Sequence, residues 1–253
     1  MDTQLLMKTA SLAGELMLSS GAETYRVENT MYLMLNTAEK IELAEVFVIM
    51  TGITATLKVK NENSISMVKR VNNRVTNMNC ILEVNSISRA YCSKEITLEE
   101  AYDKLTKIKN RVYTRLENRL SVIGICVGFA MFFGGNVGDV IATLAVGVFL
   151  TLCITIGEKL HFQSFLQDVF SSFGIAFASI VLRAFYVNLN LDVVMISSIM
   201  PLVPGVAITN AVRDTLQGDY ISGCARILEA FLKAAAIAIG IGLGIISIGS
   251  IVF

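Results

Sequence analysis

The chain has 253 residues, a mean hydropathy of +0.62 and equal numbers of acidic and basic residues, 21 of each. The balanced charge gives no indication of a nucleic-acid partner, and five cysteines without a CxxC pair indicate neither a zinc site nor a disulfide framework. A single histidine, His161, excludes a multi-histidine metal site and argues against a Ser-His-Asp triad. We therefore expect a protein that is not an enzyme and that needs no metal or cofactor.

Charge is distributed unevenly along the chain. Residues 1–119 contain 16 Lys or Arg and 14 Asp or Glu, which is the density of an ordinary soluble domain, whereas residues 120–253 contain only 5 and 7. This contrast predicts a soluble domain over residues 1–116 and a transmembrane domain over residues 117–253.

The first half has the pattern of a small α+β domain. Apolar residues recur at spacings of three and four from Leu5 to Leu16 and predict a helix. This helix should end at Gly21, because glycine tolerates the left-handed conformation. β-Branched residues from Ala44 to Val71 predict two or three strands. Further helices are expected over residues 23–39, 80–91 and 98–116.

Long apolar runs dominate the second half, and each could cross a hydrocarbon core of about 30 Å at about 1.5 Å per residue. A buried soluble core could account for one such run but hardly for five. We therefore predict an α-helical integral membrane protein with about five transmembrane helices, preceded by a small cytosolic α+β domain. The predicted spans, of which the first is marginal in length, are residues 120–134, 137–156, 169–187, 193–212 and 234–253.

Small residues lie four positions apart in most of these runs, which places them on one helix face where backbones can approach closely. We expect these faces to pack against each other or against a partner, although glycine and alanine are also simply frequent in membrane helices. The sets are Gly124/Gly128, Gly138/Ala142, Gly174/Ala178 and Ala236/Gly240/Gly244.

Basic residues crowd the approach to the first run and predict that the soluble domain is cytoplasmic. The connections expected on the other side, around residues 134–136 and 188–192, contain no Lys or Arg. With five spans, the C-terminus would then face outside the cell membrane. The basic residues are Lys104, Lys107, Lys109, Arg111, Arg115 and Arg119.

The stretch Pro201-Leu-Val-Pro204-Gly205 interrupts the fourth run. Two prolines remove two helix N–H donors, and Gly205 permits a non-helical turn, so the helix should kink or unwind there. Transporters use such breaks at membrane depth to bind solutes and ions. A structural kink against a neighbouring helix is the alternative interpretation.

Polar residues continue after the break. Asn210 and Asp214 share a helix face at spacing i, i+4, and Arg226 lies one turn before Glu229. These residues could line a solute path, or they could form salt bridges where the chain re-enters the interface.

Other charged residues are isolated. Arg183 would need a carboxylate or carbonyl partner if it lies in the bilayer, or it could extend to the outer surface. Asp139, one turn into the second run, could bind a coupling ion, but we favour a helix N-terminal carboxylate. In the soluble domain Glu23, Arg26 and Glu28 are interpreted as solvated helix charges.

Two segments resemble motifs of the threonine/serine exporter family. Residues 20–28, SGAETYRVE, are similar to its early motif. Residues 201–230, PLVPGVAITNAVRDTLQGDYISGCARILEA, are similar to its characteristic proline-to-glutamate stretch. The order of domains and the number of spans also agree. The resemblance implies export of small polar solutes, such as threonine and serine or, as in related two-component exporters, succinate.

Full-length members of that family are similar to a fusion of this unit with a second membrane unit. The chain ends at Phe253 and so resembles the larger component of a split form, which implies a smaller membrane protein as partner, with a homo-oligomer as a further option. The matched motif supplies the candidate substrate pathway: Pro204, Gly205, Asn210, Asp214, Asp219 and Arg226. Candidate gating or structural groups are Glu28, Arg26, Arg183 and Asp139.

The leading hypothesis is a subunit of a secondary exporter driven by an ion gradient, since the sequence has no P-loop motif GxxxxGK followed by Ser or Thr. Arg183, Arg213 or Arg226 could bind the carboxylate that amino acids and dicarboxylates share. The alternatives are a cytosolic enzyme or sensor domain that the spans merely anchor, and a membrane subunit that only scaffolds its partner.

Overall fold

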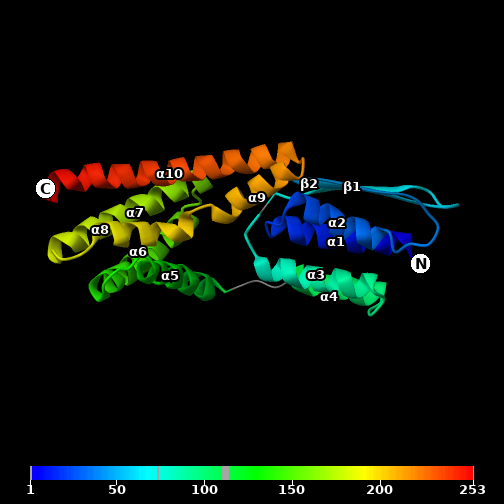
Figure 1. Cartoon of the computed structure of the whole chain (residues 1–253), viewed down its shortest axis with the longest axis horizontal. Coiled ribbons are helices and arrows are strands. Elements are labelled where there is room, and N and C mark those ends of the chain that lie inside the picture. The colour runs from blue at the N-terminus through cyan, green and yellow to red at the C-terminus, as the bar shows by residue number, and fades with distance from the viewer. Residues whose placement is uncertain (1, 73, 110–113, 253) are drawn as a thin grey trace. The chain divides into compact units, whose positions relative to one another are not determined.

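The computed structural model describes residues 2–72, 74–109 and 114–252 (Figure 1). Contacts within the chain divide it into two compact units. Unit 1 comprises Met1–Val112 and Gly205–Leu228, and unit 2 comprises Tyr113–Pro204 and Glu229–Phe253. The division by contacts differs from the division of the sequence at residues 116 and 117, because the second segment of unit 1 packs with the N-terminal elements.

The N-terminal part of unit 1 is an α+β arrangement, as the sequence predicted. Two helices precede three strands, and two helices follow them. The elements are α1 (Thr3–Ser19), α2 (Thr24–Leu35), β1 (Ile41–Ile49), β2 (Gly52–Val59), β3 (Ile65–Arg70), α3 (Met78–Cys92) and α4 (Leu98–Lys109). The helix predicted over residues 98–116 is described as far as Lys109, and positions 110–113 lie outside the described residues.

Local sequence explains where the helices of this part begin. Asp2 caps α1 by accepting hydrogen bonds from the backbone N–H groups of Gln4 and Leu5. Thr97 and Glu100 exchange side-chain to backbone hydrogen bonds before α4, which is the pattern of a capping box. Each cap satisfies N–H groups that the first helical turn leaves without partners.

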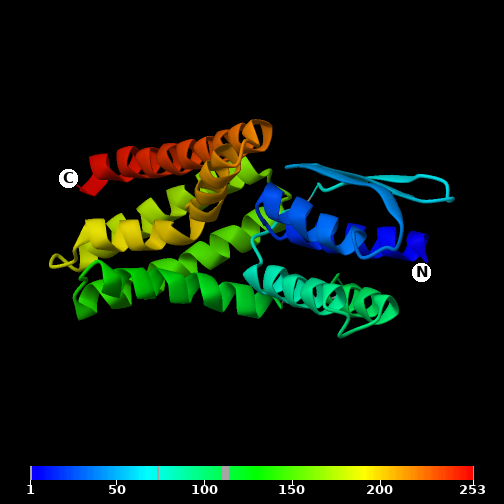
Figure 2. The ribbon, with the colours of Figure 1, turned by 45° about the vertical axis from the view of Figure 1, so that its right-hand side comes forward.

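The core of this part lies around α1, ten of whose 17 residues are buried. The sheet is antiparallel in the order β1-β2-β3. It lies on one side of α1 and α2, and α3 and α4 lie on the other side (Figures 1 and 2). Alternate residues of β2 are buried, namely Ile53, Ala55, Leu57 and Val59. This period of two is the pattern of a sheet with one face on the core.

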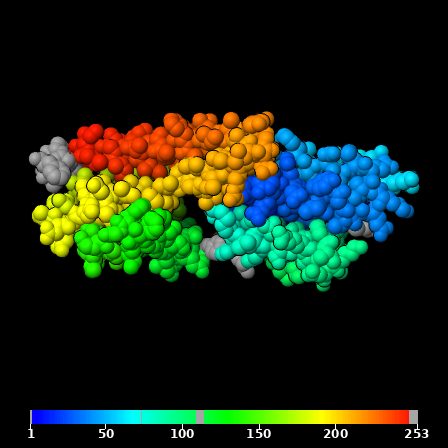
Figure 3. Space-filling view, in the orientation of Figure 1, coloured from blue at the N-terminus to red at the C-terminus, as the bar shows by residue number. Residues whose placement is uncertain are grey.

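The second segment of unit 1 contains α9 (Gly205–Leu216) and the first turns of α10 (Tyr220–Val252). In the space-filling view this orange segment lies against the blue N-terminal residues of the same unit (Figure 3). The buried residues of α9 are Asn210, Ala211 and Asp214, so its buried face is mainly polar. Buried polar groups require hydrogen-bond partners, and the turn between α1 and α2 supplies them.

Unit 2 is helical in the part that the structure describes. Its elements are α5 (Arg115–Phe132), α6 (Val137–Lys159), α7 (Ser164–Phe185), α8 (Leu191–Ile199), the 3₁₀ helix η1 (Met200–Leu202) and the remainder of α10. Thr114 with Glu117, and Asn136 with Asp139, form capping boxes that start α5 and α6.

Three of the described helices, α6, α7 and α10, are long and apolar enough to cross a membrane. A fourth span is counted if the bent pair Leu191–Leu202 and Gly205–Leu216 is one span. The sequence predicted about five. The run 120–134 lies largely in α5, which is not among the candidates because three of its 18 residues are charged. The run 193–212 is not one continuous helix, because it is interrupted at the two prolines, as predicted.

Small residues allow a close approach of helices in unit 2. A Cβ atom on Gly240 of α10 would overlap the Ser172 hydroxyl and the Val169 carbonyl oxygen of α7. A Cβ atom on Gly124 or Gly128 of α5, in contrast, would have no atom of the described residues within 4 Å. Packing through small residues is therefore confirmed for α7 and α10, whereas the two positions in α5 have room for a side chain among the described residues.

Candidate functional site

The turn between α1 and α2 has backbone groups that the two helices themselves do not satisfy. Gly21 has a φ of +83°, the left-handed conformation expected of the residue that ends a helix. Glu23 is the N-cap of α2, but its side chain makes no capping hydrogen bond. The turn therefore needs hydrogen-bond partners from elsewhere in the chain.

Two carboxylates lie at the start of α2. The backbone N–H of Thr24 donates to Oδ1 of Asp214 at 3.1 Å, and the Thr24 hydroxyl donates to Oδ2 of Asp219 at 3.0 Å. A helix N-terminus carries partial positive charge and free N–H groups, both of which favour a carboxylate. Asp214 therefore acts as a cap for α2, although about 190 residues separate it from that helix.

Two further side chains satisfy carbonyl groups of the same turn. The Asn210 side-chain amide donates to the carbonyl oxygen of Gly21 at 2.7 Å. Nη2 of Arg226 donates to the carbonyl oxygen of Ala22 at 2.8 Å, and its Nε donates to Oδ2 of Asp214 at 2.9 Å. The side chains of this ion pair are 5% and 0% exposed. Because each ion has its charge partner and hydrogen bonds, the pair can be buried without a free charge.

Glu23 forms a second ion pair at the edge of the turn. Its Oε1 accepts a hydrogen bond from Nη1 of Arg213 at 2.5 Å, and its Oε2 lies 3.6 Å from Nη1 of Arg26. Burial acts to raise the pKa of Glu23, but hydrogen bonds from its own backbone N–H and from Arg213, with the charge of Arg26, hold that pKa below its usual value. The carboxylate is therefore ionised at neutral pH.

Glu28 connects α2 to the sheet. Its Oε1 accepts a hydrogen bond from the backbone N–H of Val48 in β1 at 2.8 Å. Burial raises the pKa of Glu28, and the negative charges of Asp219 and Asp214 raise it further, against the lowering effect of the Val48 N–H. The protonation of Glu28 therefore depends on Asp214 in α9 and on Asp219 in the turn that follows α9.

We call these connected residues the turn network. They are Gly21, Ala22, Glu23, Thr24, Asn210, Arg213, Asp214, Asp219 and Arg226. The network unites the two segments that resemble family motifs, residues 20–28 and 201–230, although they lie far apart in the sequence.

Four of the six candidate pathway residues meet in the turn network: Asn210, Asp214, Asp219 and Arg226. Their hydrogen bonds go to protein atoms of unit 1, which is the arrangement of a joint that fixes α9 and α10 to the turn. The other two, Pro204 and Gly205, lie outside it, where η1 has ended and α9 begins. A role of these six residues in a substrate pathway stays a prediction. Of the candidate gating groups, Arg26 contacts the network through Glu23. The negative charges of Asp214 and Asp219 raise the pKa of Glu28.

The remaining two candidates lie in unit 2. Oδ2 of Asp139 accepts from the backbone N–H of Asn136 at 2.9 Å, so it is a helix N-terminal carboxylate, the interpretation favoured above. Its Oδ1 also accepts from the backbone N–H of Asn190 at 2.7 Å, which connects the starts of α6 and α8. Arg183 donates to the carbonyl oxygen of Leu189, one of the two kinds of partner expected for it.

The sequence missed Glu23 and Thr24 as members of a site. The interpretation of Glu23 as a solvated charge is wrong, because the residue is only 5% exposed. The available signal was Gly21: a helix that ends at glycine just before another begins leaves backbone groups to be satisfied. Nothing in the local pattern indicates which distant segment supplies the partners.

In the described part of the chain, an α+β unit is combined with three or four helices that are long and apolar enough to cross a membrane, as expected of a helical membrane protein. A family model described as "Putative threonine/serine exporter" matches residues 8–247, and the chain belongs to this family. The description of this family names export and not catalysis.

One relative is a protein of Mycobacterium tuberculosis (strain ATCC 25618 / H37Rv) named "Probable threonine/serine exporter". It is 23% identical over 249 residues, which cover 95% of this chain and 46% of the relative. The chain thus spans about half the length of the curated relative that it matches. No solved structure matches the chain.

Proposed function

We propose that the chain is a subunit of a secondary transporter that exports small polar solutes, either threonine- or serine-like amino acids or a dicarboxylate such as succinate. The observation that carries this proposal is the family match over residues 8–247, which includes both the α+β unit and the membrane helices. If the chain were an enzyme held at the membrane by an anchor, we would expect a family match over the α+β unit alone and not over the apolar helices as well.

We further propose that a second membrane unit completes the transporter. The curated relative is about twice as long as the matched region, so its other half is available for a second unit. In the split form that the sequence resembles, this unit is a smaller, separately encoded membrane protein. We also propose that an ion gradient drives export by the complex of the chain and this partner.

The turn network supports a mechanical role for the α+β unit in transport. It fixes α9, which begins directly after the break at Pro204, to the turn between α1 and α2. α10 is held to the same turn through Arg226 and continues into an apolar span. Movement of the α+β unit would therefore be transmitted to the start of α9 and to the first turns of α10, which both connect to the apolar helices.

Export can be tested in cells that co-express the chain and its smaller membrane partner. After loading with serine- or threonine-containing peptides, or with succinate, we expect faster efflux of the matching solute than in cells that lack either component. The measurement is the rate of solute appearance outside the cells. Absence of efflux for every solute, with both components stably in the membrane, would contradict the proposal.

Five spans with a cytoplasmic α+β unit complete the proposed topology. α5 supports this count although its apolar part is short, because it runs antiparallel to α6: the start of α5 and the end of α6 line one cavity. If α6 crosses the membrane, an antiparallel α5 would cross it in the opposite direction.

Reporter fusions test this topology. A fusion at Gly134, between α5 and α6, should be active only outside the cell membrane, as should one after Phe253. A fusion at His161, between α6 and α7, is the control and should be active inside. Cytoplasmic activity at Gly134 would show that α5 does not cross.

A further inference from the structure

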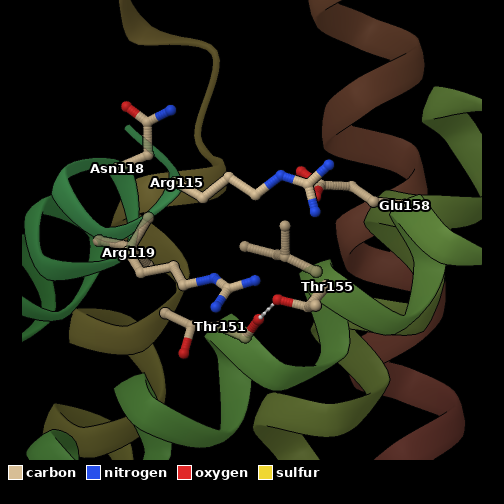
Figure 4. A pocket seen from close by; sticks show the side chains of 8 residues that line it. Arg115, Asn118, Arg119, Thr151, Thr155 and Glu158 are labelled. Atoms are coloured by element: carbon tan, nitrogen blue, oxygen red, sulfur yellow. Dashed lines mark hydrogen bonds between the residues drawn. The ribbon is translucent and has the colours of Figure 1, made fainter. Parts of the chain in front are cut away.

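A cavity of about 80 Å³ lies between α5 and α6 in unit 2 (Figure 4). The first turns of α5 contribute Arg115 and Arg119, and the last turns of α6 contribute Thr151, Thr155 and Glu158. Both arginine side chains extend from α5 toward α6, Arg115 toward Glu158 and Arg119 toward the two threonines. The turn network uses none of these residues.

The charged side chains at this cavity have no partner among the described residues. Within the part of the chain that the structure describes, no ion pair or hydrogen bond involves the side chains of Arg115, Arg119 or Glu158. The Thr151 hydroxyl donates to the carbonyl oxygen of Val148, and the Thr155 hydroxyl donates to that of Thr151, each at 2.7 Å. Their hydroxyl oxygens therefore remain as acceptors.

These groups are complementary to an amino-acid zwitterion. Guanidinium groups bind carboxylates through paired N–H donors, and a carboxylate with hydroxyl oxygens can accept hydrogen bonds from an ammonium group. A dicarboxylate could use the arginines, but its second carboxylate would then lie near the negative charge of Glu158. The cavity has room for roughly five to eight water-sized groups, which fits the about seven or eight non-hydrogen atoms of serine or threonine.

We propose that this cavity is a binding site for a small hydroxy amino acid, in which Arg115 and Arg119 bind the α-carboxylate and Glu158 binds the α-ammonium group. This site rests on the proposed transport function and would be the place where the transporter recognises its substrate. The basic start of α5 is the part that the charge rule places at the cytoplasmic face. The cavity then opens on the side from which an exporter takes up its substrate.

Binding to the purified full chain, reconstituted with its membrane partner, tests the site. The probes are L-serine and glycerate, which has a hydroxyl group in place of the ammonium. We expect Glu158→Gln to weaken serine binding roughly tenfold or more, as for the loss of a charge-assisted hydrogen bond. Glycerate binding should stay the same or become stronger, because Gln keeps a hydrogen-bond acceptor and removes a negative charge near the anion. Arg119→Gln should weaken both ligands, and Arg119→Lys should weaken them less because it keeps the charge.

Lys159→Gln is the matched control, because this exposed neighbour of Glu158 does not line the cavity, and it should bind both ligands as the wild type does. Serine affinities of Glu158→Gln and Arg119→Gln within twofold of the wild type would overturn the site, as would a wild type that binds no serine. If these variants bind and export serine normally, the site is wrong while the transport function stands. A wild-type complex that exports no solute would instead remove the function itself.

Discussion

Asp214→Asn is expected to lower the free energy of unfolding of the chain by about 3–5 kcal/mol, the usual result of breaking a buried ion pair from one side. The substitution leaves the guanidinium of Arg226 buried, 5% exposed, without its counter-charge. It also weakens the cap on α2, because an amide oxygen replaces a carboxylate at the N–H of Thr24. The measurement is denaturant unfolding of the full chain in detergent micelles.

Asp103→Asn is the control for this substitution, since Asp103 is an exposed acid of α4 in the same unit. Its stability should change by less than about 0.5 kcal/mol. A double-mutant cycle with Arg226→Gln should give a coupling energy well above zero, because either single change removes the same pair. If Asp214→Asn is as stable as Asp103→Asn, the ion pair does not hold α9 and α10 to the turn.

Gly240→Ala is expected to destabilise the packing of α10 against α7 by about 1–3 kcal/mol, the range typical of overpacking. The added methyl group would overlap the Val169 carbonyl oxygen, which is a backbone atom and cannot move as a side chain does. The helices must therefore separate or shift along each other. Thermal unfolding of the full chain in micelles measures the loss.

Gly242→Ala is the matched control two residues along the same helix. Its added methyl group would meet no atom of the described residues within 4 Å. Because alanine favours the helix over glycine by about 0.5–1 kcal/mol, this change should be neutral or stabilising. Equal destabilisation by both substitutions would mean that glycine at position 240 is not required by packing against α7.

The sequence was sufficient for elements whose signals are local. The helix that ends at Gly21 and the strands between residues 41 and 70 follow from spacing, β-branched residues and turn residues within a few positions. The family was also recognisable, because two long motifs carry the resemblance. The break at Pro201 and Pro204 followed from the loss of helix N–H donors.

The sequence was insufficient where a residue's role depends on a distant partner. Asn210, Asp214 and Arg226 show the same helical spacing whether they line a solute path or bond to a backbone turn about 190 residues away. Hydropathy alone also placed the first span from residue 120, whereas α5 begins at Arg115. The capping pair Thr114 and Glu117 was the available signal for that start.

The turn network also has a consequence for biosynthesis. The turn between α1 and α2 leaves the ribosome early, but Asp214 emerges 190 residues after Thr24, roughly 10–40 s later at about 5–20 residues per second. Throughout that time the start of α2 lacks its cap, and the two apolar helices α6 and α7 are made before α9. Completion of unit 1 is therefore a late event in assembly. A chain that stalls before residue 214 would leave this turn without the side chains that satisfy its backbone groups.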